Sequence, residues 1–413
     1  MKWNQNNPGT VARTVLAVII LLAAAVGLLR AVRQTLPPQE SAQPEPPSAP
    51  VETPTSTPAP EPTPEPDAEV KKLLAGMSVR EKICQLLIVQ PDSLATVKDG
   101  TKRVSPELAK ALKTYPVGGV LMSLKNMESA KQLRALTDDL QKQAALPMLI
   151  CVDEEGGSIA RLMQKVGTTK LDNMYAYRNK GPGLARLNAR TIGEDLAAFG
   201  FNTDLAPVAD VWSNPDNKVI GERAYSDDPA IAAELVAAAV QGFHDSGTIC
   251  CLKHFPGHGS TRADSHEEAA YVDESLEALR KGALLPFQSG IDAGADMVMV
   301  GHLTAKQIDS VPATFSRKLV TDLLREELGF SGVVITDGLE MAAAGDASDG
   351  EKALRALDAG CDLLLDLYDI PGTVEALEQA VRDGTLTEDA LDAHVLRILK
   401  MKLAYGLTPS DAA

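Results

Sequence analysis

The sequence predicts an α/β fold: a (β/α)8 TIM-type barrel that forms a single catalytic domain. Eight short apolar segments alternate with longer helical segments, the pattern of a parallel sheet that helices cover on both faces. The number eight favours closure into a barrel. An open doubly wound sheet is the alternative, but no GxGxxG segment follows the first strand. Polar residues stand at several strand ends, where such barrels carry their functional groups.

The eight expected strands are nearly continuous apolar runs, as strands buried on both faces require. Longer helical stretches separate them, for example residues 129–145 and 229–247. In chain order the strands are expected at 85–89 (QLLIV), 118–122 (GGVLM), 148–153 (MLICVD), 202–211 (NTDLAPVADV), 248–255 (TICCLKHF), 296–302 (DMVMVGH), 332–337 (GVVITD) and 362–366 (DLLLD).

Two segments of different character precede the barrel. Residues 14–29 carry no charge and are flanked by Arg13 and Arg30. This predicts an uncleaved membrane anchor near the lower length limit for a spanning helix, with a cleaved signal peptide as the alternative. Residues 37–66 hold 12 of the 26 prolines and no lysine or arginine, which predicts an extended, disordered spacer. The predicted domains are an anchor (1–33), a Pro/Glu-rich linker (34–67) and the barrel (68–413).

Charge and cysteine content limit the possible partners. The chain has 40 Lys+Arg and 56 Asp+Glu, a formal net charge of −16, which argues against nucleic acid as a partner because phosphate binding needs a basic surface. The number of cysteines is odd, and each lies in an apolar run, so we interpret them as buried thiols and not as disulfides or metal ligands. They are Cys84, Cys151, Cys250, Cys251 and Cys361.

Asp337 is the first candidate for catalysis. It ends the expected strand 332–337, directly after four residues of apolar character. A carboxylate in such a position is a good covalent nucleophile for acetal chemistry. The alternative is an N-cap for a helix that starts near Leu339. Polar residues at other strand ends favour the nucleophile, since Asp153, Lys253, His254 and His302 also end expected strands.

The segment 253–269 (KHFPGHGSTRADSHEEA) holds half of the six histidines. His254 and His258 are four residues apart, but the Pro-Gly pair between them breaks any helix that would align them as metal ligands. We therefore expect no zinc site. In an extended loop Asp264 and His266 share a side, so Asp264 can polarise His266 for proton transfer near neutral pH. A solvated loop histidine is the alternative.

Several blocks of the sequence occur in the order of a known family. KHFPGHG is followed by ADSH and then by GFSGVVITDGLEM. Together these resemble glycoside hydrolase family 3, and within it the β-N-acetylglucosaminidase branch. The resemblance covers essentially all of residues 68–407. Further matching blocks are VDEEGGSIARL (152–162), IGERAYSDDP (220–229), PATFS (312–316) and VLRILKMKLAYGL (395–407).

The resemblance implies a role for each matching residue. Asp337 would be the nucleophile, His266 the general acid/base and Asp264 its partner. No metal and no organic cofactor is implied. One position departs from many relatives, which have a second carboxylate where this chain has Gly338; this departure should affect rate and not the class of reaction. Sugar binding is implied for Asp153, Arg161, Arg223, Lys253 and His254.

The implied activity is that of a β-N-acetylhexosaminidase, a retaining exo-glycosidase that removes terminal non-reducing β-linked N-acetylglucosamine. With the anchor and linker, the resemblance predicts a monomer held outside the cytoplasm at the membrane, or secreted if the segment is cleaved, and acting on peptidoglycan fragments. A histidine base also leaves phosphate open as an acceptor in place of water. The alternatives are a β-glucosidase-type exo-glycosidase of the same family, a non-catalytic wall-glycan-binding protein and a barrel without a sugar site.

Overall fold

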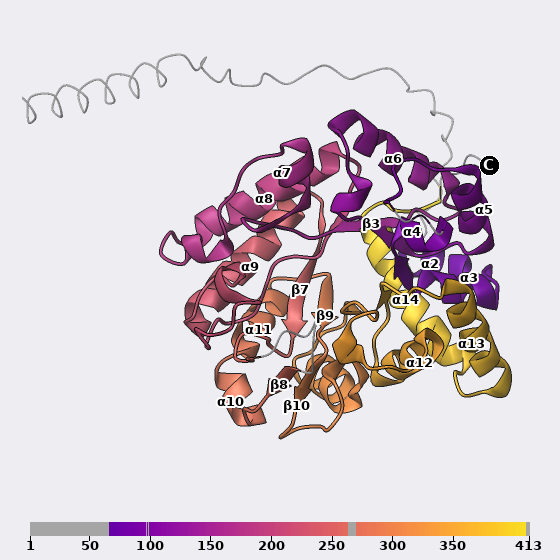
Figure 1. Ribbon diagram of the computed structural model, residues 1–413. Coiled ribbons are helices and arrows are strands. Elements are labelled where there is room, and N and C mark those ends of the chain that lie inside the picture. Colours follow the sequence, from indigo (N-terminus) through magenta and orange to yellow (C-terminus); the bar gives the residue numbers. More distant parts are fainter. Residues whose placement is uncertain (1–65, 96, 98, 263–269, 410–413) are drawn as a thin grey trace, which may run out of the picture. The chain divides into compact units, whose positions relative to one another are not determined.

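The computed structural model describes residues 66–95, 97, 99–262 and 270–409, which belong to one compact unit, Thr63–Ala413. At its centre lie eight parallel strands, of which β3, β7 and β9 are labelled in Figure 1; their order is β11-β9-β7-β6-β3-β2-β1-β12. Each predicted strand segment contains one of them. The strands are β1 (Leu87–Val89), β2 (Gly119–Leu121), β3 (Leu149–Val152), β6 (Thr203–Asp204), β7 (Ile249–Phe255), β9 (Met297–Val300), β11 (Val333–Thr336) and β12 (Leu364–Leu365).

The sheet curls into a nearly closed barrel, as predicted. Its two outer members, β11 and β12, are neighbours: Ile335 and Leu363 form an isolated parallel bridge, and the Thr336 N–H donates to the Leu363 carbonyl over 3.0 Å. Every hydrogen-bonded pair of barrel strands is parallel. All side chains of β1, β3, β9 and β11 are buried, because helices outside and other strands inside leave neither face to water.

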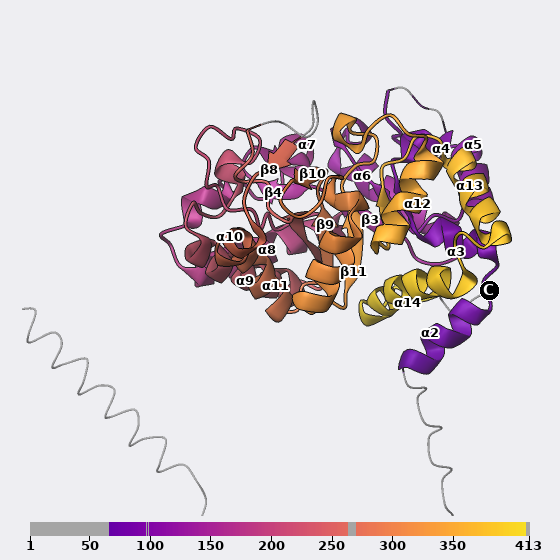
Figure 2. The same ribbon diagram turned by 90° about the horizontal axis from the view of Figure 1, so that it is seen from below.

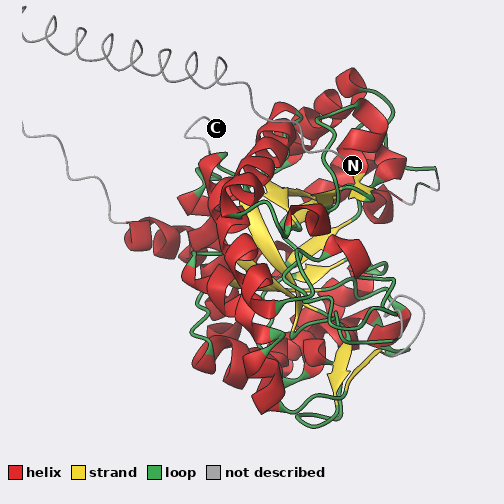
Figure 3. Cartoon of the chain, turned by 90° about the vertical axis from the view of Figure 1, so that its left-hand side faces the viewer, coloured by secondary structure: helices red, strands yellow, loops and turns green. Residues whose placement is uncertain are grey.

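Helices surround the strands (Figure 3). The two stretches predicted as helical, 129–145 and 229–247, form α6 and α9. The helices of seven or more residues are α2 (Pro66–Ala75), α3 (Val79–Gln85), α5 (Pro106–Thr114), α6 (Ala130–Gln143), α8 (Pro182–Ala198), α9 (Pro229–Asp245), α11 (Leu284–Asp292), η5 (Lys318–Glu327), α12 (Asp349–Ala359), α13 (Ile370–Asp383) and α14 (Glu388–Ala404). Shorter ones are α4 (Pro91–Ala95), α7 (Arg161–Val166) and α10 (Leu276–Lys281).

Local sequence sets where these helices begin and end. The Asp228 side chain accepts hydrogen bonds from two backbone N–H groups of the first turn of α9, and proline follows it, which satisfies donors that a helix start leaves unpaired. Ser348 and Glu351 form a capping box on α12. The same helix ends at Gly360 with φ of 113°, a conformation that glycine adopts without steric cost.

The five cysteines are buried and free, as predicted. None of the helices among the described residues is long and apolar enough to cross a bilayer. The predicted anchor and nearly all of the predicted linker fall in residues 1–65, outside the described residues.

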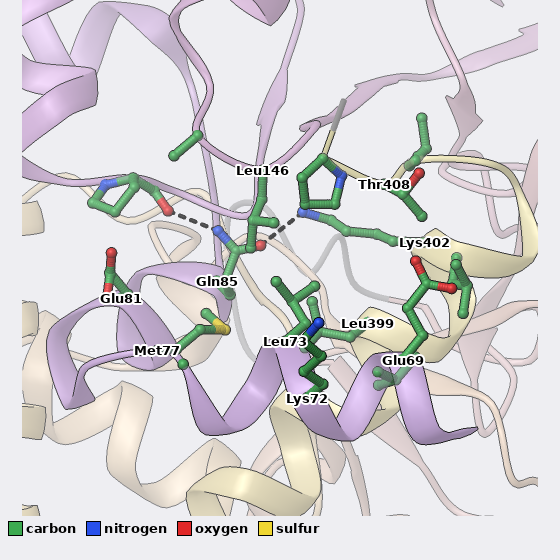
Figure 4. Close-up of a pocket in the computed structure, with 17 residues that line it drawn as sticks. Glu69, Lys72, Leu73, Met77, Glu81, Gln85, Leu146, Leu399, Lys402 and Thr408 are labelled. Atoms are coloured by element: carbon green, nitrogen blue, oxygen red, sulfur yellow. Dashed lines mark hydrogen bonds between the residues drawn. The ribbon is translucent and has the colours of Figure 1, made fainter. Parts of the chain in front are cut away.

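The N-terminal ends of the strands enclose a buried lysine. Helix α14 lies beside α2 (Figure 2) and carries Lys402, which is 1% exposed. Its ammonium group donates to the Gln85 Oε1 atom over 2.8 Å and to the Gly118 carbonyl over 2.9 Å, at one wall of a cavity of about 480 Å³ (Figure 4). Burial lowers the pKa of Lys402 to about 7, because a cation loses its hydration there.

Replacing Lys402 by methionine should change how stability depends on pH. An unfolded lysine has a pKa near 10.4, whereas the pKa of folded Lys402 is about 7. Between these values the unfolded chain binds the extra proton, so the free energy of unfolding rises with pH by up to about 1.4 kcal/mol per unit. The Lys402→Met variant should lack this rise. Urea unfolding of both proteins from pH 7 to 10 measures it.

Lys400→Met serves as the control, since Lys400 is exposed on the same helix. It should keep the pH trend of the wild type. Parallel stability curves for wild type and Lys402→Met would contradict the assignment of a neutral lysine above pH 7.

Candidate active site

A cavity of about 180 Å³ opens at the C-terminal ends of the barrel strands. It contains six of the eight residues predicted for the site, and the polar strand ends converge there as the barrel fold requires. The other two, Asp264 and His266, lie in 263–269, outside the described residues. The lining residues are Leu121, Asp153, Glu155, Ile159, Arg161, Leu205, Arg223, Lys253, His254, Met299, Asp337, Gly338, Glu340, Met341, Leu365 and Asp366.

Lys253 is the centre of a buried ion-pair network on one wall. Strand β7 presents its ammonium group, which is 2.6 Å from the Asp153 Oδ1 atom and 2.7 Å from the Glu155 Oε1 atom. Arg223 binds Glu155 with its Nε and Nη2 atoms, both at 2.8 Å. Lys253 and Glu155 are 2% and 3% exposed. Such charges are tolerated in an interior only when they are paired and hydrogen-bonded.

The network controls the charge state of its members. Burial alone would raise the pKa of Glu155, but Arg223 and Lys253 hold it well below its usual range. Burial would likewise lower the pKa of Lys253, but Asp153 and Glu155 hold it above its usual range. The site therefore carries fixed charges at neutral pH, and the free face of Asp153 can accept hydrogen bonds from hydroxyl groups.

Arg223 makes most of its contacts with the protein. Its predicted sugar binding stays a prediction, because three of its N–H groups bind protein: two bind Glu155, and Nη1 donates to the Val219 carbonyl over 3.0 Å. The short helix η3 (Gly221–Arg223) brings it there. Arg223 lines the cavity, yet its fork positions Glu155, and only its remaining donors can reach a ligand.

Arg161 is placed by the start of α7. The Glu154 carboxylate accepts hydrogen bonds from the Leu162 and Met163 N–H groups, over 2.8 and 3.0 Å, and so caps the helix of which Arg161 is the first residue. Two short antiparallel strands, β4 (Glu154–Gly156) and β5 (Ile159–Ala160), hold this segment. The Arg161 guanidinium makes no ion pair with the residues that the structure describes, and it lines the cavity.

His254 is held by a carboxylate that sequence reasoning missed. Asp210 is fully buried and accepts a hydrogen bond from the His254 Nδ1 atom over 2.7 Å and from the His258 N–H over 2.6 Å. Since a carboxylate accepts, the hydrogen lies on Nδ1, which leaves Nε2 of His254 for a ligand. Burial would raise the pKa of Asp210, but His254 lowers it. His258 thus helps to hold the segment that follows β7, and its Nδ1 atom lies 2.8 Å from the Thr261 hydroxyl.

Asp337 follows β11 and lines the cavity. Its Oδ1 atom accepts a hydrogen bond from the Gly338 N–H over 2.8 Å, and its own N–H donates to the Val300 carbonyl over 2.9 Å. His302, also predicted from its strand end, fixes the next peptide: its Nε2 atom donates to the Gly338 carbonyl over 2.8 Å. The nucleophile candidate is therefore held by backbone contacts to β9 and by His302.

Four acidic residues that line the cavity or support its residues were not predicted: Glu155, Asp210, Glu340 and Asp366. A signal existed for three of them, because Glu155 stands two residues after Asp153, and Asp210 and Asp366 end or nearly end the expected strands 202–211 and 362–366. Glu340 gave no such signal. Its approach to the cavity depends on how the chain turns after β11.

One group among the described residues could hold a metal ion, and it lies apart from the cavity. His244, Cys250 and Asp296 have ligand atoms within 4.8 Å of one another. Asp296 precedes β9 and accepts a hydrogen bond from the Cys250 N–H over 3.0 Å, so the group sits at the N-terminal ends of the strands.

Comparison with known proteins gives consistent matches. Glycosyl hydrolase family 3 N terminal domain matches residues 78–401. The beta-hexosaminidase A of Pseudoalteromonas piscicida is 33% identical over 328 residues, 72% of this chain and 55% of the relative. The beta-hexosaminidase of Stenotrophomonas maltophilia (strain K279a) is 38% identical over 281 residues, 67% of this chain and 83% of the relative.

A solved structure gives the same likeness. A glycoside hydrolase family 3 β-N-acetylglucosaminidase from Paenibacillus sp. str. FPU-7 superimposes with a TM-score of 0.76 and 35% identity, over 82% of this chain and 64% of that one. The chain therefore spans about half the length of the Pseudoalteromonas relative and less than two thirds of the Paenibacillus structure.

Lys253→Met should destabilise the protein strongly. Removing one partner of a buried charge network leaves the other charges uncompensated, which costs about 3–5 kcal/mol. The free energy of unfolding in urea measures this. Lys281→Met is the control, since its side chain is 75% exposed and only pairs with Glu277; an exposed pair of this kind contributes less than about 1 kcal/mol. Equal losses in both variants would contradict the network.

Proposed function

The chain belongs to glycosyl hydrolase family 3, and on that premise we propose that it is a retaining β-N-acetylhexosaminidase acting on terminal β-linked N-acetylglucosamine. The observation that carries the proposal is the cavity at the strand ends, where Asp337 shares the wall with Asp153, Arg161, Lys253 and His254. A nucleophilic carboxylate beside donors and acceptors for hydroxyl groups suits glycoside chemistry. The names of the relatives supply the choice of sugar.

Each half-reaction uses Asp337 and His266. In the first, an Asp337 oxygen bonds to the anomeric carbon while the bond to the leaving oxygen breaks, and His266 gives that oxygen its proton. In the second, His266 takes a proton from water, the water oxygen bonds to the anomeric carbon, and the bond to Asp337 breaks. Asp264 keeps His266 oriented. Retention follows because the carbon is inverted twice.

The polar groups across the cavity hold the sugar. Asp153 accepts from ring hydroxyls, and its carboxylate is held in place by Lys253 at 2.6 Å. His254 offers Nε2, because Nδ1 is taken by Asp210. Arg161 supplies a fork for a hydroxyl or an acetamide carbonyl. Groups fixed in advance by protein contacts lose little freedom when a ligand binds.

The proposal extends to location and natural substrate. The uncharged stretch 14–29 and the proline-rich stretch 37–66 suggest a domain tethered outside the cytoplasm by a membrane anchor, within reach of the cell wall. The natural substrate would then be peptidoglycan fragments with terminal N-acetylglucosamine.

Loss of the nucleophile should abolish turnover. The full-length chain should hydrolyse an aryl β-N-acetylglucosaminide, and Asp337→Asn should lower kcat by at least about 10⁴-fold, because an amide cannot form the covalent intermediate. His266→Ala should lose more on poor leaving groups than on activated ones, because only the former need a proton in the first step. Release of the aryl group measures both.

Cleavage of the aryl glucoside alone would instead indicate a β-glucosidase. Sugar binding without turnover, unaffected by Asp337→Asn, would indicate a binding protein.

Water should be the acceptor in the second half-reaction. Turnover with and without added inorganic phosphate should give free N-acetylglucosamine in the same amount, as resolved by chromatography of the products. A histidine base does not repel an anion, so phosphate is the acceptor that could replace water. A yield of sugar 1-phosphate that depends on phosphate would contradict hydrolysis and make the enzyme a phosphorylase.

Purified cell-wall fragments should release N-acetylglucosamine when treated with the full-length chain. The matched substrate is chitobiose, which presents the same terminal sugar without the wall structure. Release from chitobiose but not from wall fragments would contradict the peptidoglycan assignment and leave the reaction class intact.

A further inference from the structure

The wall of the cavity near β11 and β12 carries two carboxyl groups that the proposed reaction does not use. Glu340 lies three residues after Asp337, and Asp366 directly follows β12; both line the cavity. The Glu340 Oε2 and Asp366 Oδ1 atoms are buried and have no hydrogen-bond partner among the described residues. A buried polar atom without a partner costs free energy. Each of these two residues that line the cavity therefore keeps one acceptor oxygen that no described protein group uses.

Asp366 is held rigidly in an unfavourable backbone conformation. It is 3% exposed, and its φ of 53° is the one positive value among the non-glycine residues described. Its N–H donates to the Ile88 carbonyl over 2.8 Å, and its Oδ2 atom accepts a hydrogen bond from the Gln90 side chain. Strained residues of this kind persist where the surrounding structure fixes them, often at functional sites. These contacts leave the Oδ1 atom as the unused acceptor.

Glu340 fills the space that Gly338 leaves empty. A Cβ atom at position 338 would lie 2.4 Å from the Glu340 Oε2 atom and 2.7 Å from Oε1, so the observed position of the carboxyl group requires glycine there. The Gly338 N–H is the group that supports Asp337. Glu340 is thus packed against the peptide that holds the nucleophile candidate.

Both acids have a raised pKa. Burial, and next the neighbouring Asp366, raise the pKa of Glu340 to about 8, and burial raises the pKa of Asp366. Near neutral pH the pair therefore retains a proton and still presents acceptor oxygens to the cavity.

From this geometry we propose that Glu340 and Asp366 form a second sugar-binding wall, which accepts hydrogen bonds from the sugar beside the anomeric carbon. The inference rests on the proposed function, since that function puts the anomeric carbon at Asp337. The donors in reach on a pyranose are the acetamide N–H on C2 and the hydroxyl on C6. Lys253 and Asp153, on β7 and after β3, then hold the more distant hydroxyls.

The test is a pair of isosteric variants of the full-length chain. Glu340→Gln and Asp366→Asn should each lower kcat/KM for an aryl β-N-acetylglucosaminide about 10-fold, which is within the usual range for the loss of one hydrogen bond. Asparagine adopts positive φ as aspartate does, so Asp366→Asn can keep its backbone. Asp346→Asn, an exposed position on the same loop, is the control and should equal wild type.

Stability separates binding from a structural role. Each substitution replaces a buried carboxyl group of which one oxygen lacks a partner, so the urea midpoint of each variant should be equal to or higher than that of wild type. A lower midpoint together with the loss of activity would assign the two residues to folding and overturn the proposal. Activity equal to that of the control would overturn it as well.

Substrate analogues identify the donor. If the pair accepts from C6, the loss should vanish on the aryl 6-deoxy-N-acetylglucosaminide; if it accepts from C2, the loss should vanish on the aryl 2-deoxyglucoside. An equal loss on all three substrates would mean that the two acids affect activity only by positioning Asp337. That result would overturn the proposed hydrogen bonds to the sugar.

Binding of free N-acetylglucosamine keeps this test independent of catalysis. If the wild type proves inactive, the proposed function fails, and calorimetric titration with the sugar decides the inference alone. Weaker binding by both variants than by wild type and Asp346→Asn supports the wall. Equal binding by all four proteins, or none by wild type, overturns it.

Discussion

The ammonium group of Lys253, buried between two carboxylates, is the interaction on which the mouth of the barrel depends. A cation that is 2% exposed is stable only with anionic partners within hydrogen-bond distance. Asp153 and Glu155 provide them, and Arg223 in turn compensates Glu155. One charge thereby joins the ends of β3 and β7 and the segment of η3, and protein contacts hold the polar groups of the site in place before any ligand arrives.

The two walls of the cavity differ in how completely their charges are satisfied. The wall of Lys253 is a closed set of ion pairs, whereas Glu340 and Asp366 each keep a buried oxygen without a partner. Unsatisfied buried atoms are rare in proteins, and a site that binds a ligand is one place where they occur. Asp337 lies between the two walls, held by backbone contacts and by His302. The contrast explains why loss of Lys253 is expected to lower stability, whereas replacing Glu340 or Asp366 is expected to weaken substrate binding without lowering stability.

At the N-terminal ends of the strands the buried charged side chains have a different part, because they form hydrogen bonds with backbone groups. Asp362 accepts a hydrogen bond from the Val334 N–H over 2.9 Å and is compensated by Arg325, Arg397 and His394. Lys402 donates to a carbonyl in the same manner. Each group completes the hydrogen bonding of a strand start, so this end of the barrel supports the fold.

The sequence by itself determined the eight strands, the strand-end candidates and the family resemblance, because burial on both faces produces apolar runs that are legible locally. It also placed six site residues that share one cavity; Asp264 and His266 remain predictions. Only the tertiary structure decided what those side chains touch. Arg223 binds Glu155, 68 residues away, Asp210 orients His254, 44 residues away, and Glu340 reaches the cavity over Gly338. Such pairings arise from closure of the barrel, and the local sequence does not indicate which distant side chain a charged residue will contact.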